Sequence, residues 1–250
     1  MGYVGTESFQ GCTKLRLANT EANLLTIDVV RELSQALKSA ERSSGAVMLC
    51  SGDKFFSNGL DLNWALSRSP EELRDMFLSL GDLVLQMLEC NVPVVGALKG
   101  HAIGAGKTLF AACDYRFGSA GRVLIGMPEI LLGVPNPYFA DQLTRHIAGD
   151  AAASDLIYSG RLVPAEDLVA HGLVNRVSDK AEVENDAWNT TLELADLPRA
   201  AFAECKAMRV QDLCDRIRAR LAARTDRLIE LWFSADTQGR LTAAAQRMRR

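Results

Sequence analysis

The sequence of 250 residues lacks the patterns that mark membrane, secreted and metal-binding proteins. No apolar run reaches the length of about 20 residues that a bilayer requires, and the N-terminus has no signal-peptide pattern. The six cysteines are scattered singly, without the CxxC or cysteine–histidine spacing of metal sites, so no metal is predicted. Such cysteines indicate reduced thiols in an intracellular protein, cytoplasmic if bacterial, and the last residues are not a Ser-Lys-Leu peroxisomal address.

A large excess of charge is also absent. The chain carries 28 lysine and arginine residues against 31 aspartate and glutamate residues, which gives a net charge of −3. This balance provides no general attraction to nucleic acid or to an anionic membrane, so we expect neither as a partner. The composition, 48% hydrophobic and 24% charged, suits one large globular domain. We expect structural roles for the three histidines, His101, His146 and His171.

Short apolar strand patterns alternate with amphipathic helix patterns through residue 177, and helix patterns alone follow. Such alternation predicts an α/β fold with a parallel sheet and right-handed crossovers. The late helices must cover either the same body or a neighbouring subunit. We therefore assign residues 1–195 to the core, which holds the ligand site, and residues 196–250 to a C-terminal helical region.

Local signals predict several element boundaries. The segment Ser69-Pro-Glu-Glu72 combines a serine N-cap, proline at the first helical position and glutamate three residues after the cap, which predicts a helix start. Residues 1–10 show no regular pattern and are expected to be loose. Residues 160–167 are expected to begin a helix, and residues 173–177 to form a strand.

A glycine-rich turn, Gly104-Ala-Gly106, follows the apolar run at residues 94–98 and opens an expected helix. One interpretation is a tight strand-to-helix turn with close packing. The other is an anion site, because free N–H groups and the helix dipole favour negative charge at a helix N-terminus. The spacing matches neither a phosphate loop nor a dinucleotide fingerprint.

Glu129 stands alone among apolar residues, between Met127 and the run at residues 130–132. An unpaired buried carboxylate is costly, so Glu129 either forms a salt bridge, with Arg122 or Arg145, or has a chemical function. Apolar surroundings raise the pKa of a carboxyl group, which suits a general base or acid near neutral pH. A cradle of N–H groups with one desolvated carboxylate is what enolate chemistry requires.

Two further groups of residues have two interpretations each. Tyr138 and Phe139 fit a packed core or the wall of an apolar ligand tunnel. The basic C-terminus fits a solvated helix end or a partner for a ligand phosphate; its arginines are Arg240, Arg247, Arg249 and Arg250.

Four segments together carry a more specific pattern. They are Phe-Phe-Ser-Asn-Gly-Leu-Asp-Leu at 55–62, Lys-Gly-His-Ala-Ile-Gly-Ala-Gly at 99–106 followed by Cys113-Asp114, Met-Pro-Glu-Ile-x-x-Gly at 127–133, and Ser-Gly-Arg-Leu-x-x-Ala at 159–165 continuing to His-Gly-Leu-Val at 171–174. Over nearly the whole chain they resemble the crotonase (enoyl-CoA hydratase/isomerase) superfamily. The resemblance implies a crotonase-like spiral of ββα units with C-terminal trimerisation helices. It also implies an acyl-CoA thioester substrate, with coenzyme A as part of the substrate and no separate cofactor, and a homotrimer or dimer of trimers.

Carried over by position, the resemblance assigns roles to individual residues. The backbone N–H groups of Leu60 and Ala105 would form the oxyanion hole, and Glu129 would be the catalytic acid–base. The CoA and acyl parts would contact six residues, some of them across a subunit boundary: Asp61, Leu62, Tyr138, Phe139, Phe233 and Arg247.

One departure from the family pattern decides the predicted reaction. Hydratases of the family carry two glutamates, and the first falls here on Thr108, preceded by Lys107, so that Glu129 alone remains. Adding water uses both acids, whereas moving a double bond needs one base. The segments at residues 55–65 and 133–139 also resemble plant-type isomerases. We therefore predict a Δ3,Δ2-enoyl-CoA isomerase of fatty acid β-oxidation.

Two alternatives stay open. The first is an enoyl-CoA hydratase or another enolate-forming CoA enzyme, in which Thr108, Asp61 or Asp141 replaces the missing glutamate. The second is a non-enzymatic crotonase-like scaffold or an RNA-binding relative. The net charge of −3 opposes nucleic-acid binding, and the acid retained near a glycine turn opposes an inactive scaffold.

Overall fold

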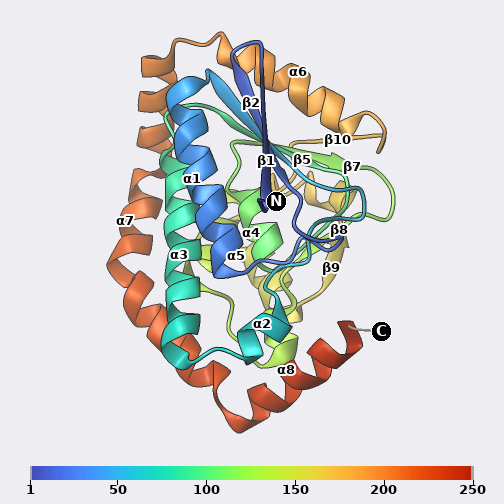
Figure 1. Ribbon diagram of the computed structural model, residues 1–250, viewed down its shortest axis with the longest axis vertical. Coiled ribbons are helices and arrows are strands. Elements are labelled where there is room, and N and C mark those ends of the chain that lie inside the picture. The colour runs from blue at the N-terminus through green and yellow to red at the C-terminus, as the bar shows by residue number, and fades with distance from the viewer. Residues whose placement is uncertain (1, 249–250) are drawn as a thin grey trace.

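Two mixed β-sheets form the centre of the computed structural model, which describes residues 2–248 (Figure 1). The larger sheet has the strand order β1-β2-β3-β5-β7-β10, antiparallel between β1 and β2 and parallel elsewhere. Its strands are β1 (Val4–Phe9), β2 (Cys12–Leu17), β3 (Ala46–Cys50), β5 (Val94–Leu98), β7 (Tyr115–Ser119) and β10 (Arg176–Ser178).

The smaller sheet has the order β4-β6-β8-β9, and its last pair is antiparallel. Its strands are short, and three of them lead directly into turns that end at the candidate site. They are β4 (Phe55–Ser57), β6 (His101–Ile103), β8 (Leu124–Gly126) and β9 (Leu162–Pro164).

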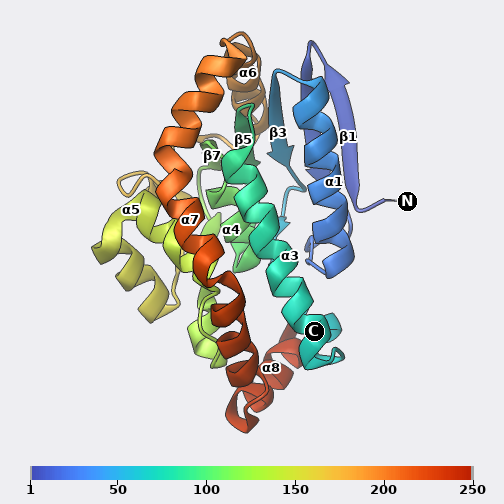
Figure 2. The same cartoon turned by 90° about the vertical axis from the view of Figure 1, so that its left-hand side faces the viewer.

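Helices cover the sheets and extend beyond them (Figures 1 and 2). The helices α3 and α7 run side by side, and α6 packs against β3, β5 and β7. The helices are α1 (Ile27–Ser43), α2 (Leu62–Leu66), α3 (Pro70–Glu89), α4 (Ala105–Ala111), α5 (Tyr138–Ser159), α6 (Val183–Ala195), α7 (Arg199–Trp232) and α8 (Ala235–Met248), with 3-10 turns η1 (Pro128–Leu132) and η2 (Ala165–Leu168).

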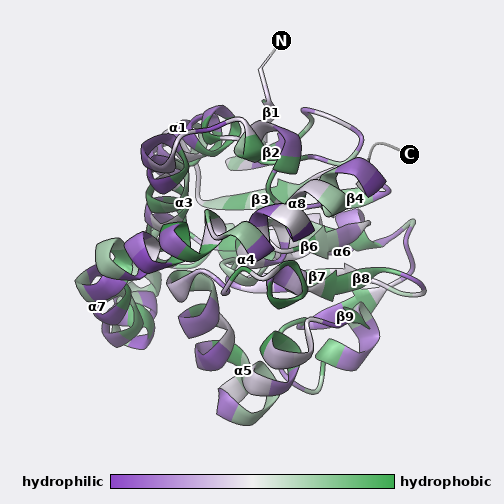
Figure 3. Ribbon diagram, turned by 90° about the horizontal axis from the view of Figure 1, so that it is seen from below, coloured by the Kyte–Doolittle hydropathy of each residue, from purple (hydrophilic) through white to green (hydrophobic). Residues whose placement is uncertain are grey.

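The strand β3 shows why the central strands are continuous apolar runs. Val47 and Leu49 pack in the main core with α1 and α3, whereas Met48 and Cys50 face the cluster under α6. A strand buried on both faces has no polar alternation. In Figure 3 hydrophobic residues accordingly gather on the central strands, and hydrophilic residues lie on the outer faces of the helices.

The helix α3 begins where the sequence predicts. Ser69 Oγ accepts from Glu72 N at 3.2 Å, and the Glu72 carboxylate accepts from Ser69 N at 2.8 Å, with Pro70 at the first helical position. This reciprocal capping satisfies backbone donors that the helix leaves free.

Three local predictions were wrong. Residues 4–9 form β1, because antiparallel pairing with β2 orders a segment whose side chains lie mostly exposed and therefore give no periodic apolar signal. Residues 162–164 form β9 before the 3-10 turn η2, where a helix start was expected. The last strand begins at Arg176, because the chain at Val174 turns back to η2, where the Val174 N–H donates to Leu168 O at 3.4 Å.

The α/β fold is confirmed, although the sheets are mixed and not purely parallel. Among residues 2–248 no helix is both long enough and apolar enough to cross a membrane. The boundary between residues 195 and 196 coincides with the end of α6 and stays a prediction as a domain boundary.

Candidate active site

A cavity of ≈ 280 Å³ lies where three segments of the smaller sheet end. The segment after β4 contributes Leu60, the segment after β6 contributes Gly104 and Ala105, and the segment after β8 contributes Glu129. Helices α3, α7 and α8 complete the wall with apolar side chains, which are Phe77, Leu80, Trp232, Leu241 and Ala244. The cavity is therefore mainly apolar, and the end formed by the three segments contributes the polar residues Asn58, Thr108 and Glu129.

Two backbone N–H groups lie at that end. Leu25 N donates to Gly59 O at 2.8 Å, and Asp61 N donates to Leu25 O at 3.0 Å. Because this bridge uses the residues on both sides of Leu60, the Leu60 N–H points away from Leu25 and is not used by it. Ala105 is the first residue of α4, where N–H groups have no acceptor within the helix.

Two glycines bring these segments together. Gly59 has a φ of +81°, and a Cβ there would lie 2.8 Å from Ile103 O and 3.4 Å from Ala105 N. Gly104 has a φ of +55°, and a Cβ there would lie 2.9 Å from Glu129 Oε1. Glycine is needed at both positions, because any side chain would add both backbone strain and a steric clash.

Glu129 presents its carboxylate to the cavity from η1. The residue lines the cavity and is partly accessible from it, whereas Oε2 is buried and has no hydrogen-bond partner among the described residues. Burial raises the pKa of the Glu129 carboxyl from 4.5 to about 7, while its own backbone N–H and the charge of Lys107 act in the opposite direction. A carboxyl group with this pKa can both accept and donate a proton near neutral pH.

The salt bridges suggested for Glu129 do not form. Arg145 binds Asp141 at 3.1 Å and Asp150 at 2.9 Å, and Arg122 is exposed. Among the described residues, Glu129 makes no ion pair within 4 Å. The carboxylate is left available for a ligand.

No second acid faces this cavity within the part of the chain that the structure describes. Thr108 lines it, and its hydroxyl donates to Gly104 O at 3.2 Å. Asp61 caps α2 by accepting from Asn63 N at 2.9 Å and Trp64 N at 3.1 Å. Asp141 lines a second cavity and is paired with Arg145. Neither aspartate is positioned to replace the missing glutamate.

The structure brings some of the expected ligand-binding residues together and leaves others apart. Leu62 and Phe139 line the cavity with Glu129. Tyr138 instead lines the second cavity, between α5 and α7, with Arg224 over its ring. Phe233 is partly exposed at the end of α7, and Arg247 is exposed in the last turn of α8. Arg249 and Arg250 lie outside the described residues.

Sequence reasoning missed several residues of the wall. Trp232 is buried, contacts the ring of Phe77 edge-on and lines the cavity, and its Nε1 has no partner among the described residues. Lys107, two residues after Ala105 in α4, is not one of the residues that line the cavity but is buried as well. The apolar position of Trp232 in a helical pattern indicated burial only, whereas a lysine within an otherwise apolar helix was a signal that could have been used.

The histidines show no metal site. His101 Nδ1 accepts from Leu124 N at 3.0 Å, which ties β6 to β8. Among residues 2–248 no cluster of His, Cys, Asp and Glu side chains could hold a metal ion. All six cysteines are free thiols.

The two mixed sheets with C-terminal helices define a crotonase fold. The human mitochondrial Δ3-Δ2-enoyl-CoA isomerase has this fold: its crystal structure matches with a TM-score of 0.94 at 24% identity, over 99% of this chain and 98% of that one. Residues 7–246 match the family described as enoyl-CoA hydratase/isomerase. The chain belongs to the enoyl-CoA hydratase/isomerase family.

Some relatives in this family are named hydratases, and others are named isomerases. The chain is 34% identical over 233 residues to the probable enoyl-CoA hydratase echA17 of Mycolicibacterium paratuberculosis. This match covers 92% of this chain and 89% of that protein. It is 32% identical over 163 residues to enoyl-CoA delta isomerase 3 of Arabidopsis thaliana, which covers 63% of this chain and 68% of that protein. It is 31% identical to the human peroxisomal bifunctional enzyme over 193 residues, 76% of this chain, and spans only 26% of that longer protein.

Proposed function

We propose that this protein is a Δ3,Δ2-enoyl-CoA isomerase of fatty acid β-oxidation. The observation that carries the proposal is that one carboxylate, Glu129, faces the apolar cavity among the described residues. Moving a carbon–carbon double bond requires one group that takes a proton from one carbon and returns it to another. A carboxyl group with a pKa of about 7 suits both halves of that exchange.

The proposed reaction begins with the thioester carbonyl between the N–H groups of Leu60 and Ala105. Glu129 removes a proton from C2 of the 3-enoyl chain, and the electron pair of that C–H bond moves toward the carbonyl to give a dienolate. The oxygen carries the negative charge and accepts both N–H bonds, which strengthen as the charge develops. Protonated Glu129 then gives its proton to C4, and the double bond comes to lie between C2 and C3.

The environment of Thr108 supports isomerisation over hydration. Its hydroxyl is engaged with Gly104 O, at the position where hydratases of the family carry a second glutamate. A water molecule in this cavity would have only Glu129 as a carboxylate to orient and activate it. The apolar wall also disfavours water, because a bound water needs two or more polar partners.

Hydration is the second candidate, and a specific observation favours it. The relative at 34% identity, which the chain covers over most of both lengths, is named a probable enoyl-CoA hydratase. In that case Glu129 would act on a water molecule as well as on the substrate. The homotrimer or dimer of trimers stays a prediction that accompanies either reaction. So do ligand contact by Tyr138 and ligand contacts by Phe233 and Arg247 across a subunit boundary.

Incubation with matched 3-enoyl-CoA and 2-enoyl-CoA substrates of several chain lengths separates the two reactions. An isomerase converts 3-enoyl-CoA to the conjugated 2-enoyl-CoA, so the absorbance of the conjugated thioester rises and the mass is unchanged. A hydratase removes that absorbance from 2-enoyl-CoA and adds the mass of one water. Rapid hydration with slow isomerisation would overturn the proposal. Absence of turnover, with no heat on titration of an acyl-CoA analogue, would favour a non-enzymatic scaffold.

A further inference from the structure

A second cavity, of ≈ 600 Å³, lies between α5 and α7. It adjoins the candidate active site, because Glu129 and Phe139 line the active-site cavity while their neighbours Ile130 and Tyr138 line the second one. The second cavity has no part in the proposed isomerisation. Its character is also different, because five arginines line it: Arg145 on α5, and Arg216, Arg220, Arg224 and Arg227 on α7.

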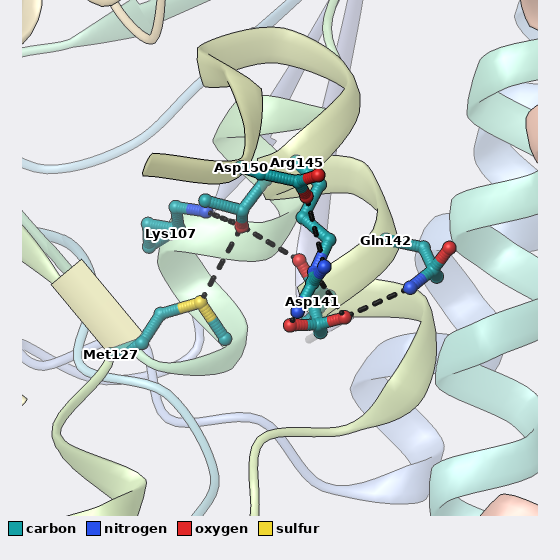
Figure 4. A network of polar contacts seen from close by, with 8 residues as sticks. Lys107, Met127, Asp141, Gln142, Arg145 and Asp150 are labelled. Carbon is teal, nitrogen blue, oxygen red and sulfur yellow. Dashed lines mark hydrogen bonds and ion pairs between the residues drawn. The ribbon is translucent and has the colours of Figure 1, made fainter. Parts of the chain in front are cut away.

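Positive charge dominates this wall. Asp141 is the one acidic residue that lines the cavity within residues 2–248, and it is already paired. Arg145 binds Asp141 at 3.1 Å and Asp150 at 2.9 Å, as Figure 4 shows. Arg227 pairs with Glu230 at 2.6 Å. The remaining excess of positive charge is local, since the whole chain has a net charge of −3.

Three of the arginines have no acidic partner. Within the part of the chain that the structure describes, no carboxylate lies within 4 Å of Arg216, Arg220 or Arg224. They lie four residues apart on one face of α7, where like charges destabilise a helix. Arg218, on the same helix but outside the cavity, is by contrast paired with Glu89 on α3. The repulsion among the three arginines would be relieved by a bound anion.

The same wall contains a second unsatisfied polar group. The side-chain Nδ2 and Oδ1 of Asn136 are both buried and have no hydrogen-bond partner among residues 2–248. Buried polar atoms in proteins nearly always have a partner, and ordered water or a ligand supplies it where the protein does not. Asn136 is independent of the arginines, because it comes from the loop before α5 and not from α7.

The arrangement of the cations indicates the class of ligand. Guanidinium groups bind phosphate oxygens through two parallel N–H bonds. Arg216 and Arg224 lie about 12 Å apart along the helix axis at 1.5 Å per residue, so three cations in a row match a chain of phosphate groups better than one phosphate. All three arginines are exposed, so a dissolved ligand can reach them. The volume lies within the range of small-molecule sites, about 300–1,000 Å³.

We propose that the second cavity is a binding site for a ligand that carries two or more phosphate groups, held by Arg216, Arg220 and Arg224. The proposal does not depend on the reaction at Glu129, because the two cavities share no lining residue. An inorganic polyphosphate and a nucleoside polyphosphate both have this chemistry. Tyr138 and the exposed Tyr158 also line the cavity and offer rings to a base, which only the nucleotide has.

Calorimetric titration of the full chain with tripolyphosphate and with ATP tests the site. Arg216→Gln, Arg220→Gln and Arg224→Gln should each weaken binding about tenfold, because each removes a charged hydrogen-bond donor. Arg218→Gln is the matched control: it removes the same charge from the same helix outside the cavity and should leave the affinity unchanged. Equal affinity for both probes identifies the phosphate chain as the recognised part, and tighter binding of ATP adds the base.

Two results of these titrations would overturn the proposal. One is absence of binding by both probes, and the other is equal weakening in Arg218→Gln, which would indicate a general electrostatic effect. Competition with an acyl-pantetheine thioether, which fills the active site but has no phosphate, would also overturn it. Sedimentation of Arg220→Gln without ligand checks the use of these arginines in a subunit contact, and a fall in mass would assign them to that contact instead.

His146 provides a readout that needs no arginine variant. Burial lowers the pKa of His146, and the charges of Arg209 and Arg216 lower it further. A polyanion bound at Arg216 opposes these charges, so saturating ligand should raise the pKa of His146 in an NMR titration. The His146 signal is identified by its loss in His146→Gln, and His101, on β6 outside the cavity, should not shift. An unchanged His146 titration with ligand bound would overturn the placement of the ligand.

The outcome is separate from that of the proposed function. These measurements need no turnover, so they test the second cavity whether the protein is an isomerase or a hydratase. Absence of isomerisation with polyphosphate binding intact would overturn only the proposed function.

Discussion

Two buried sets of acid and lysine lie in the same chain and differ in whether their charges touch. Asp114 accepts from Val94 N at 2.8 Å and from Lys206 Nζ at 2.7 Å, and Lys206 also donates to Met87 O at 3.0 Å. In the other set, Lys107 is buried and donates to Thr144 Oγ1, Oε2 of Glu129 is buried without a hydrogen-bond partner, and the two side chains form no ion pair within residues 2–248. The first set joins β5, α3 and α7, whereas the second lies beside a cavity.

The difference separates a structural acid from a reactive one. The Asp114 carboxylate is engaged by two donors, so protonation would break existing bonds. Glu129 has a buried oxygen without a partner, so a proton meets no competitor there. An unpaired buried acid is unfavourable for folding, and such groups concentrate at functional sites. Substitution of each acid in turn tests this difference.

The largest effect is expected from Glu129→Gln. Glutamine keeps the shape of the side chain but cannot take a proton, so kcat for isomerisation should fall by about 10²–10⁴-fold. The midpoint of thermal unfolding should stay the same or rise, because the variant removes an unpaired buried carboxyl group. Activity assays beside differential scanning calorimetry check both parts. A variant with near-parent kcat would show that Glu129 is not the base, and one with a large loss of stability would place it with Asp114.

The opposite pattern is expected from Asp114→Asn. This change leaves the Lys206 ammonium buried without its counter-charge, and breaking such a pair typically lowers the free energy of unfolding by about 3 kcal/mol. Because neither residue of the pair lines the cavity, kcat of the folded fraction should be unchanged. Urea unfolding followed by circular dichroism measures the loss.

The double change Asp114→Asn with Lys206→Met is the control for that loss. It removes both charges, so most of the stability should return. If the single variant were as stable as the parent, the pair would not be the structural element that the comparison assumes.

Much of the fold could be predicted because its signals are local. The apolar run of β3 follows from burial on both faces, and the start of α3 follows from the capping residues around Ser69 and Glu72. The strand β1 could not, because an exposed edge strand is ordered by its partner and not by its own side chains. Tertiary pairing therefore decided the element that sequence periodicity missed.

The candidate site was likewise predictable only in part. Glu129 and the glycine turn stood out, because an acid within an apolar segment and a glycine at a helix start are unusual within one short stretch. The wall contributed by Phe77 and Trp232 depends on two helices meeting from distant parts of the chain. Tyr138 and Phe139 are adjacent and face different cavities, since successive residues of a helix differ by about 100° in direction.

The smallest expected effect is the pH dependence of kcat/KM in the unmodified protein. It tests whether the Glu129 carboxyl stays shielded from water during catalysis. A base must be ionised, so kcat/KM should rise with pH through the pKa of Glu129, about 7, and level off above it. Below that midpoint the rate should fall about tenfold per pH unit, as for a single ionisation. A non-reactive acyl-CoA analogue measured over the same range separates binding from proton transfer, since its affinity should change less. An acidic limb centred near 4.5, the pKa of an ordinary glutamate, would mean that water or a hydrogen-bond donor reaches the Glu129 carboxylate during catalysis. Glu129 would then be a solvated or paired acid, and the difference from Asp114 would be lost.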